Sequence, residues 1–325
     1  MGDLAVRRAW VARTEGTALL LTSRMDDTGT VITLHADRAR AGIAPGIGGS
    51  ITHFHWGDGP RRHDWLRPAT AADLAARTAD RLASFPLVPF SNRVRAGRFT
   101  FGGHAVALPL NVWPQPHAEH GHGWQAAWSV VAHAANGLTL EYDHPADPWP
   151  FPYRARQEFL LTDDELRLTL SIENRGRETM PVGLGFHPYF PRTAGCRLSA
   201  RVDAMWATDA EVMPTALVDA DPRLRHEDGL PIAGTVLDNA FTGWRRQATI
   251  FWPETRARLL LEASPPLGFL VVYSPAGEDF FCAEPVSHCT DAFNLAAQGR
   301  ADTGMLTLQP GANLSATVRF RPNLE

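Results

Sequence analysis

The sequence predicts an all-β protein, a large antiparallel β-sandwich with few short helices. Alternation of apolar and polar residues with a period of two recurs along the chain, which is typical of strands that bury one face. Patterns of helical period are scarce. The 27 glycines and 25 prolines are spread between the candidate strands, where they indicate turns and loops. Together these features favour two packed sheets joined by long loops.

The candidate elements can be placed along the chain. The clearest strand spans 165–174, where the residues that alternate toward the core are Leu166, Leu168, Leu170 and Ile172. Residues 97–109 read as two short strands joined at Gly102-Gly103, a pair that tolerates the positive φ of a hairpin turn. Further strands are predicted at 28–35, 256–263, 268–274 and 314–320. The one predicted helix spans Ala69 to Phe85, which is rich in Ala, Leu and Arg.

The chain of 325 residues contains no repeat, low-complexity tract or linker that would divide it. Single domains commonly have about 100 to 200 residues, but all-β sandwiches and barrels run larger as one unit. Hydrophobic residues make up 44% and charged residues 20%, so the apolar material suffices for a sizeable core. We therefore predict a single domain over residues 1–325.

Charge and cysteine content restrict the compartment and the partners. A formal net charge of −4 offers no basic field for nucleic acid or an anionic membrane, so a small molecule is the expected partner. The N-terminus lacks the apolar region of a signal peptide, and no apolar run approaches the ~20 residues of a membrane span. Three cysteines without C-x-x-C spacing suit free thiols in a reducing compartment. We expect a cytoplasmic protein, as a monomer or homodimer.

The absence of lysine excludes several enzyme classes. All 31 cationic side chains are arginine. Schiff-base enzymes, pyridoxal phosphate enzymes and P-loop proteins all require a lysine amine. In addition, no G-x-G-x-x-G follows a strand and opens a helix, so a Rossmann cofactor site has no support.

Two titratable residues stand among apolar neighbours. Glu284 lies in FCAEPVSH before Pro285, which restricts it to an extended conformation. Burial there would raise the pKa of its carboxyl group toward the range of a general base; the alternative is a surface glutamate at a strand end. His187 lies in GFHPYFP, where it is either a satisfied core histidine or a group aimed at a ligand.

Two loop segments add further polar candidates. HAEHGHGWQ holds His117, His120 and His122 within six residues, beside glycines that allow a ligand to approach closely. The same spacing could chelate a metal, an alternative that the glycine-rich loop and the single nearby carboxylate of Glu119 disfavour. Arg93, in PFSNRVRAG, offers a planar fork of donors to hydroxyl groups or a carboxylate, or else is a solvated arginine.

At these segments the sequence resembles the aldose 1-epimerase (galactose mutarotase) family over nearly the whole chain. The resemblance is carried, in family order, by PLVPFSNRVRAGRFTF, HAEHGHGWQ, GFHPYF, LDNAF, FCAEPVSHCTDAFN and LQPGANLSATVRF. It implies a galactose mutarotase-like β-sandwich with the site in a groove on one sheet. It also implies a monosaccharide substrate, and no cofactor or metal.

The resemblance implies roles for seven residues. Glu284 matches the general base, His187 the general acid, and His120 a second active-site histidine that assists at the ring oxygen. The positions that match sugar-binding residues are Asn92, Arg93, Tyr189 and Asp238. Glu119 stands where relatives often carry an apolar residue, a departure that alters the rim of the expected pocket.

The implied activity is the interconversion of the α and β anomers of a hexose or pentose. Glu284 as carboxylate takes the proton of the anomeric hydroxyl while protonated His187 supplies one to the ring oxygen, and the roles reverse on ring closure. Three alternatives stay open: a hexose-6-phosphate mutarotase, a non-catalytic sugar-binding or sensor protein, and a glycoside hydrolase that uses Glu284 and Asp238 as its carboxyl pair. Loops at 53–84 and 208–235 are expected to shape the pocket.

Overall fold

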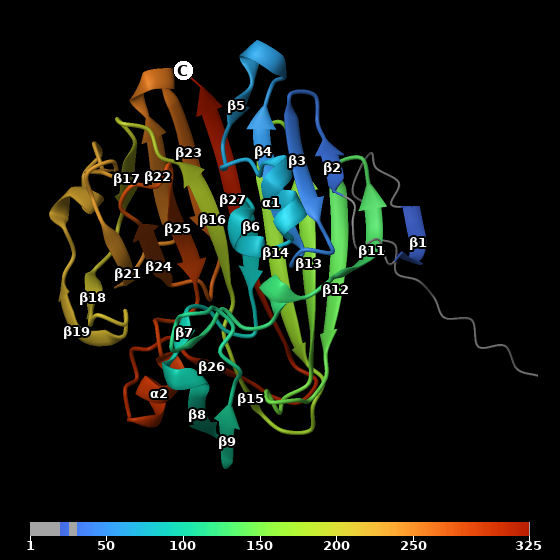
Figure 1. The fold of residues 1–325 in the computed structure, drawn as a ribbon, viewed down its shortest axis with the longest axis vertical. Helices are drawn as coiled ribbons and strands as arrows, with labels where there is room; N and C mark the ends of the chain where they lie inside the picture. The colour runs from blue at the N-terminus through green and yellow to red at the C-terminus, as the bar shows by residue number, and fades with distance from the viewer. Residues whose placement is uncertain (1–19, 26–30, 325) are drawn as a thin grey trace, which may run out of the picture.

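Two large antiparallel sheets form a sandwich in the computed structural model, which describes residues 20–25 and 31–324 (Figure 1). The first sheet has ten strands, in the order β1 (Leu20–Met25), β11 (Ser129–Ala134), β12 (Gly137–His144), β13 (Tyr153–Leu161), β14 (Leu166–Asn174), β27 (Asn313–Leu324), β23 (Ala257–Ala263), β22 (Gln247–Trp252), β17 (Arg197–Ala200) and β20 (Leu230–Pro231). The predicted all-β sandwich is confirmed.

The second sheet has eleven strands and carries the residues of interest. Its order is β19 (Pro214–Asp219), β18 (Ala204–Thr208), β21 (Leu237–Thr242), β24 (Phe269–Ser274), β25 (Phe280–Val286), β16 (Gly185–Pro191), β6 (Ser84–Leu87), β4 (Ser50–Trp56), β3 (Ala39–Ala44) and β2 (Ile32–His35), with β5 (His63–Asp64) paired to β4. Strands β16 and β25, which are far apart in sequence, are therefore neighbours at its centre.

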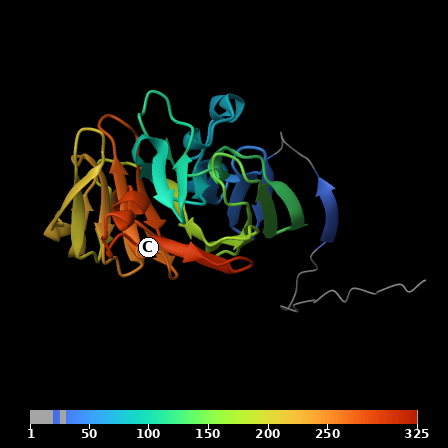
Figure 2. The ribbon, with the colours of Figure 1, turned by 90° about the horizontal axis from the view of Figure 1, so that it is seen from below.

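Short elements gather at one end of the sandwich (Figures 1 and 2). They comprise the two-stranded pairs β7 (Arg93–Val94) with β10 (Ala118–Glu119), β8 (Arg98–Phe101) with β9 (His104–Ala107), and β15 (Met180–Val182) with β26 (Leu306–Leu308), and the helix α2 (Ala292–Ala297). The other α-helix of the described residues is α1 (Ala71–Ala76). Neither helix is long and apolar enough to cross a membrane.

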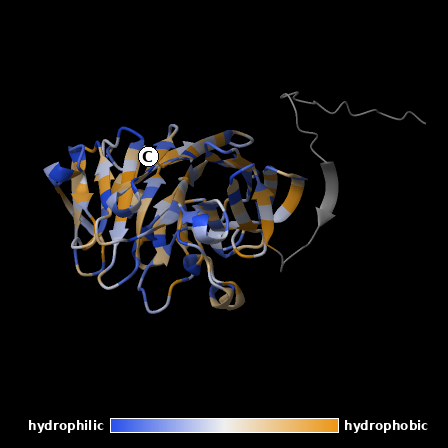
Figure 3. Cartoon of the chain, turned by 90° about the horizontal axis from the view of Figure 1, so that it is seen from above, coloured by the Kyte–Doolittle hydropathy of each residue, from blue (hydrophilic) through white to orange (hydrophobic). Residues whose placement is uncertain are grey.

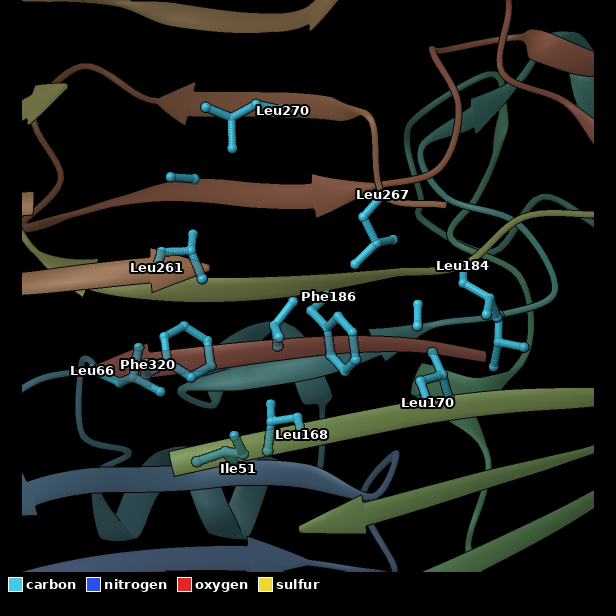
Figure 4. Packing of buried hydrophobic residues seen from close by; sticks show 14 of the residues in the cluster. Ile51, Leu66, Leu168, Leu170, Leu184, Phe186, Leu261, Leu267, Leu270 and Phe320 are labelled. Atoms are coloured by element: carbon cyan, nitrogen blue, oxygen red, sulfur yellow. The ribbon is translucent and has the colours of Figure 1, made fainter. Parts of the chain in front are cut away.

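The core fills the space between the two sheets. Phe186 of β16, Leu270 of β24, Leu168 of β14 and Phe320 of β27 belong to one buried cluster, and each has at most 2% of its surface exposed (Figure 4). Figure 3 shows the hydrophobic stretches running along the strands of both layers, with hydrophilic residues in the turns. Burial of this apolar surface is the main favourable contribution to folding.

Most of the predicted strands are confirmed. In β14 buried and partly exposed residues alternate without a break, as the period of two requires. The predicted hairpin at 97–109 is β8 and β9, with Gly102 and Gly103 both at positive φ in the turn. Of the strand predicted at 28–35, residues 28–30 lie outside the described part, and β2 begins at Ile32.

The predicted helix over Ala69 to Phe85 is wrong beyond its first turns. Thr70 and Asp73 form a capping box that starts α1, but Arg77 adopts a left-handed conformation (φ 55°) and ends it. The chain then reaches β6, in which Phe85 pairs with His187 of β16. Pairing in the central sheet thus overrides the helix propensity of this segment.

The buried imidazole of His288 makes the fold sensitive to acid. The backbone N–H of Ser91 donates to its Nε2 (3.1 Å), and its Nδ1 lies 2.8 Å from the carbonyl oxygen of Cys289, to which it donates. Burial lowers the pKa of His288 from 6.5 to about 4.

We expect the free energy of unfolding to fall as the pH drops from about 6.5 to about 4, by up to about 3 kcal/mol from His288. The free energy of unfolding falls because His288 of the unfolded chain binds a proton in this pH range, while folded His288 stays neutral. Urea unfolding at pH 7, 6, 5 and 4 measures the loss. A His288→Asn variant should show a flatter dependence, and an unchanged slope in that variant would contradict the assignment.

Candidate functional site

The two central strands of the eleven-stranded sheet bring His187 and Glu284 face to face. The register pairs Gly185 with Val286 and Tyr189 with Cys282, which sets His187 opposite Glu284. The Nε2 atom of His187 lies 3.4 Å from Oε1 of Glu284. Both residues are buried, with 6% and 2% of their surface exposed. Because both side chains stand on rigid central strands, the geometry of the pair is set by the sheet.

The pair lies in a groove of about 540 Å³. All seven residues to which the family resemblance assigned roles line this groove: Asn92, Arg93, His120, His187, Tyr189, Asp238 and Glu284. Arg67 and Val212 also line it, so both of the segments expected to shape the pocket contribute. Neither segment is loop alone, because the first contains β5 and α1 and the second contains β19 and β20. A groove of this size with few convergent polar groups suits a small ligand.

A second hollow of about 580 Å³ lies over β13, β14, β23 and β27 of the other sheet. Its described lining includes Arg167, Glu262 and Arg319 and no histidine. The groove beside Glu284 is therefore the better candidate for chemistry.

A reciprocal pair of hydrogen bonds holds Asn92 and His120. The backbone N–H of His120 donates to the carbonyl oxygen of Asn92 (2.9 Å), and the backbone N–H of Asn92 donates to Nδ1 of His120 (3.1 Å). Both residues have positive φ, 57° and 64°. Gly121 follows at φ 72°, and a Cβ there would lie 2.3 Å from the carbonyl oxygen of Val88, so only glycine fits.

This arrangement fixes the tautomer of His120. Since Nδ1 accepts a hydrogen bond, the neutral ring carries its proton on Nε2. Burial lowers the pKa of His120 well below 6.5, which keeps the ring neutral. His120 therefore offers one N–H donor, at Nε2.

Arg93 lies between two carboxylates. Its Nε is 3.1 Å from Oε1 of Glu119, and its Nη2 donates to Oδ2 of Asp238 at 3.3 Å. Glu119 is also 3.7 Å from Nε2 of His120. Two hydrogen bonds of 2.7 Å between the Asn111 amide and the Glu119 backbone hold this carboxylate in place. Glu119, which the sequence placed only at a rim, thus contacts two of the predicted site residues.

Aromatic rings form one wall of the groove. The ring of His187 packs against those of Phe85 (centroids 4.5 Å apart) and Tyr189 (4.8 Å apart), and the Phe85 and Tyr189 centroids lie 6.2 Å from each other. The Arg67 guanidinium lies over Tyr189 at 4.2 Å and over Phe280 at 4.5 Å. Flat apolar faces beside hydrogen-bonding groups suit the two sides of a sugar ring.

Burial controls the charges of the central pair. It raises the pKa of the Glu284 carboxyl group well above 4.5, and it lowers the pKa of His187 to about 3. Burial therefore favours the neutral carboxylic acid of Glu284 and the neutral imidazole of His187. The sequence-based expectation of a raised Glu284 pKa agrees in direction. The sequence predicted a protonated His187, whereas burial favours the neutral imidazole.

The other two histidines of HAEHGHGWQ point elsewhere. Nε2 of His117 lies 3.4 Å from Glu211. The ring of His122 stacks on His144 with centroids 4.0 Å apart. Together with His120 they do not converge, so the described residues give no support to a metal site made from this segment.

Several lining residues escaped prediction from the sequence. Phe85 was assigned to a helix, and Arg67 lies in a segment with no recognisable pattern. Phe280 could have been found, because it lies four residues before Glu284 along β25 and so shares its face.

Comparison with known proteins identifies the family of this chain. The family model described as aldose 1-epimerase matches residues 30–321. An uncharacterized Escherichia coli protein, YphB, is 34% identical over 264 residues, which are 79% of this chain and 88% of the relative. The galactose mutarotase of Mus musculus is 25% identical over 157 residues, 46% of this chain and 42% of the mouse protein.

Solved structures show the same fold. A candidate aldose 1-epimerase from Escherichia coli K12 is 30% identical and has a TM-score of 0.79, with 91% of this chain and 99% of that chain covered. A galactose mutarotase-like protein from Clostridium acetobutylicum has a TM-score of 0.81 at 20% identity, with 94% and 99% covered. Since the family model spans most of the sequence, this chain belongs to the aldose 1-epimerase family.

Proposed function

We propose that the protein is an aldose 1-epimerase that interconverts the α and β anomers of a neutral hexose or pentose. The observation that carries the proposal is the His187–Glu284 pair, 3.4 Å apart on adjacent central strands and open to a groove of monosaccharide-binding size. Mutarotation needs one group that takes the anomeric hydroxyl proton and one that gives a proton to the ring oxygen.

The pair holds the proton that the reaction needs. A neutral acid beside a neutral imidazole contains as many protons as a carboxylate beside an imidazolium. Transfer of the proton from Glu284 to His187 therefore creates the base and the acid without exchange with solvent. Sugar hydroxyl groups that donate to Glu284 favour the carboxylate, because hydrogen bonds to the charged form lower a carboxyl pKa.

The other groove residues position the sugar in this proposal. His120 presents its Nε2–H to the ring oxygen, and Arg93 with Asp238 offers donors and acceptors to hydroxyl groups. The ring then opens to the aldehyde, the bond to the carbonyl carbon rotates, and closure reverses both proton transfers.

A hexose 6-phosphate is a weaker candidate because the groove has more acidic than basic residues. Its lining acids are Asp73, Asp80, Glu119, Asp238, Glu278 and Glu284, and its bases are Arg67, Arg81 and Arg93. Arg67 already donates to the carbonyl oxygens of Asp80 and Leu82. A glycoside hydrolase fits less well, since the group opposite Glu284 is an imidazole and not a second carboxyl group.

The test is magnetisation exchange by NMR between the anomers of glucose, galactose, xylose, arabinose and glucose 6-phosphate. We expect faster exchange than in buffer for at least one neutral sugar, and little acceleration for the phosphate. Detectable binding without acceleration for any sugar would favour the sensor alternative.

A further inference from the structure

A third potential metal ligand lies beside the catalytic candidates. Cys282 and Glu284 are two residues apart on β25, so their side chains share one face of the strand. The thiol sulfur of Cys282, a carboxylate oxygen of Glu284 and a ring nitrogen of His187 all lie within 4.8 Å of one another. All three residues are buried, and Cys282 is a free thiol.

The chemistry of these donors selects a class of metal. Sulfur, imidazole nitrogen and carboxylate oxygen together are a set that Zn²⁺ accepts, with bonds of about 2.0–2.3 Å. Mg²⁺ and Ca²⁺ prefer oxygen ligands and do not suit a thiolate.

The surroundings suit a bound ion that is reached through the groove. His187 and Glu284 line the groove, whereas Cys282 is fully buried beneath them. An ion that enters from the groove thus meets three protein ligands, and its fourth position stays open to water. The nearby guanidinium of Arg93 is balanced by Glu119 and Asp238.

We propose that Cys282, His187 and Glu284 form a binding site for Zn²⁺ or a similar borderline divalent ion, and that ion and sugar exclude each other. Binding replaces the S–H bond of Cys282 and the O–H bond of Glu284 by bonds to the metal, and both protons pass to solvent. Only the competition with sugar rests on the proposed epimerase function. The ion in this proposal is an inhibitor, since it occupies the two groups that would transfer protons.

Titration of the reduced full-length protein with Co²⁺, a spectroscopic substitute for Zn²⁺, tests the site. Wild type should develop a thiolate-to-cobalt charge-transfer band that saturates at one equivalent and is abolished by Zn²⁺. Cys282→Ser should lose the band and bind the ion at least about tenfold more weakly. Cys289→Ser, which removes another buried thiol, is the matched control and should behave like wild type.

The outcomes separate the two proposals. A wild type without the band, or a band that survives in folded Cys282→Ser and Cys282→Ala, would overturn the metal site. If the band forms but saturating substrate leaves the cobalt affinity unchanged, the mutual exclusion fails. If the band forms as expected while no sugar in the NMR panel exchanges faster than in buffer, the metal site stands and the epimerase proposal fails.

Discussion

Glu284→Gln should lower the rate constant of enzyme-accelerated anomer exchange by about 10²–10⁴-fold. The amide keeps the size of the carboxyl group but can neither take a proton from a hydroxyl nor hold the proton that the pair shares. His187, 3.4 Å away, then has no partner for the transfer. Magnetisation exchange by NMR on the best sugar of the panel measures the effect.

The control for this variant is Glu158→Gln, on an exposed site of the ten-stranded sheet. It should retain wild-type exchange, and circular dichroism should show both variants folded. Wild-type exchange in folded Glu284→Gln would rule out proton transfer through this carboxyl group.

Arg93→Met should lower the free energy of unfolding by about 3–5 kcal/mol. The guanidinium side chain is only 13% exposed and neutralises Glu119 and Asp238, which are 9% and 26% exposed. Without it, two carboxyl groups remain in the groove with no nearby cation to offset their desolvation. Urea unfolding at pH 7 measures the loss.

Two further measurements show whether the unpaired carboxylates of Glu119 and Asp238 cause the loss of stability in Arg93→Met. Adding Glu119→Gln to Arg93→Met should recover part of the lost stability, because one buried charge is removed. The deficit should also shrink as the pH is lowered, since a carboxyl group with a raised folded pKa destabilises the fold fully above that pKa and not at all below its unfolded pKa. A deficit that neither treatment reduces would indicate lost packing of the arginine stem instead.

The sequence predicts strands well where one face alone is buried, as in β14, because the period of two is visible locally. It fails at 69–85, where an alanine-rich segment with helical spacing passes into β6 at the centre of the sheet. Which strand pairs with Phe85 is decided by β16, about a hundred residues away, and no local pattern encodes that partner.

The geometry of the site likewise depends on strand pairing that no local sequence pattern encodes. Glu284 and His187 were recognisable as polar residues in apolar segments, and the resemblance to the family assigned them roles. Their 3.4 Å approach depends on the register of β16 against β25. The position of Glu119 beside Arg93 depends on the pairing of β10 with β7. Each of these strands has two residues, which is too short for a recognisable pattern in the sequence.

The hydrogen bond from the Asn92 backbone to His120 should make the groove selective for a ring that contains an oxygen atom. With Nδ1 engaged, the imidazole has only a donor to present, so it pairs with an atom that has lone pairs. In the proposed function that atom is the ring oxygen of an aldose. A carbocycle such as an inositol, with the same hydroxyl groups but a carbon in place of that oxygen, would leave the N–H unpaired at a cost of about 1–3 kcal/mol. The groove should therefore distinguish aldoses from cyclitols by one atom that bears no hydroxyl group.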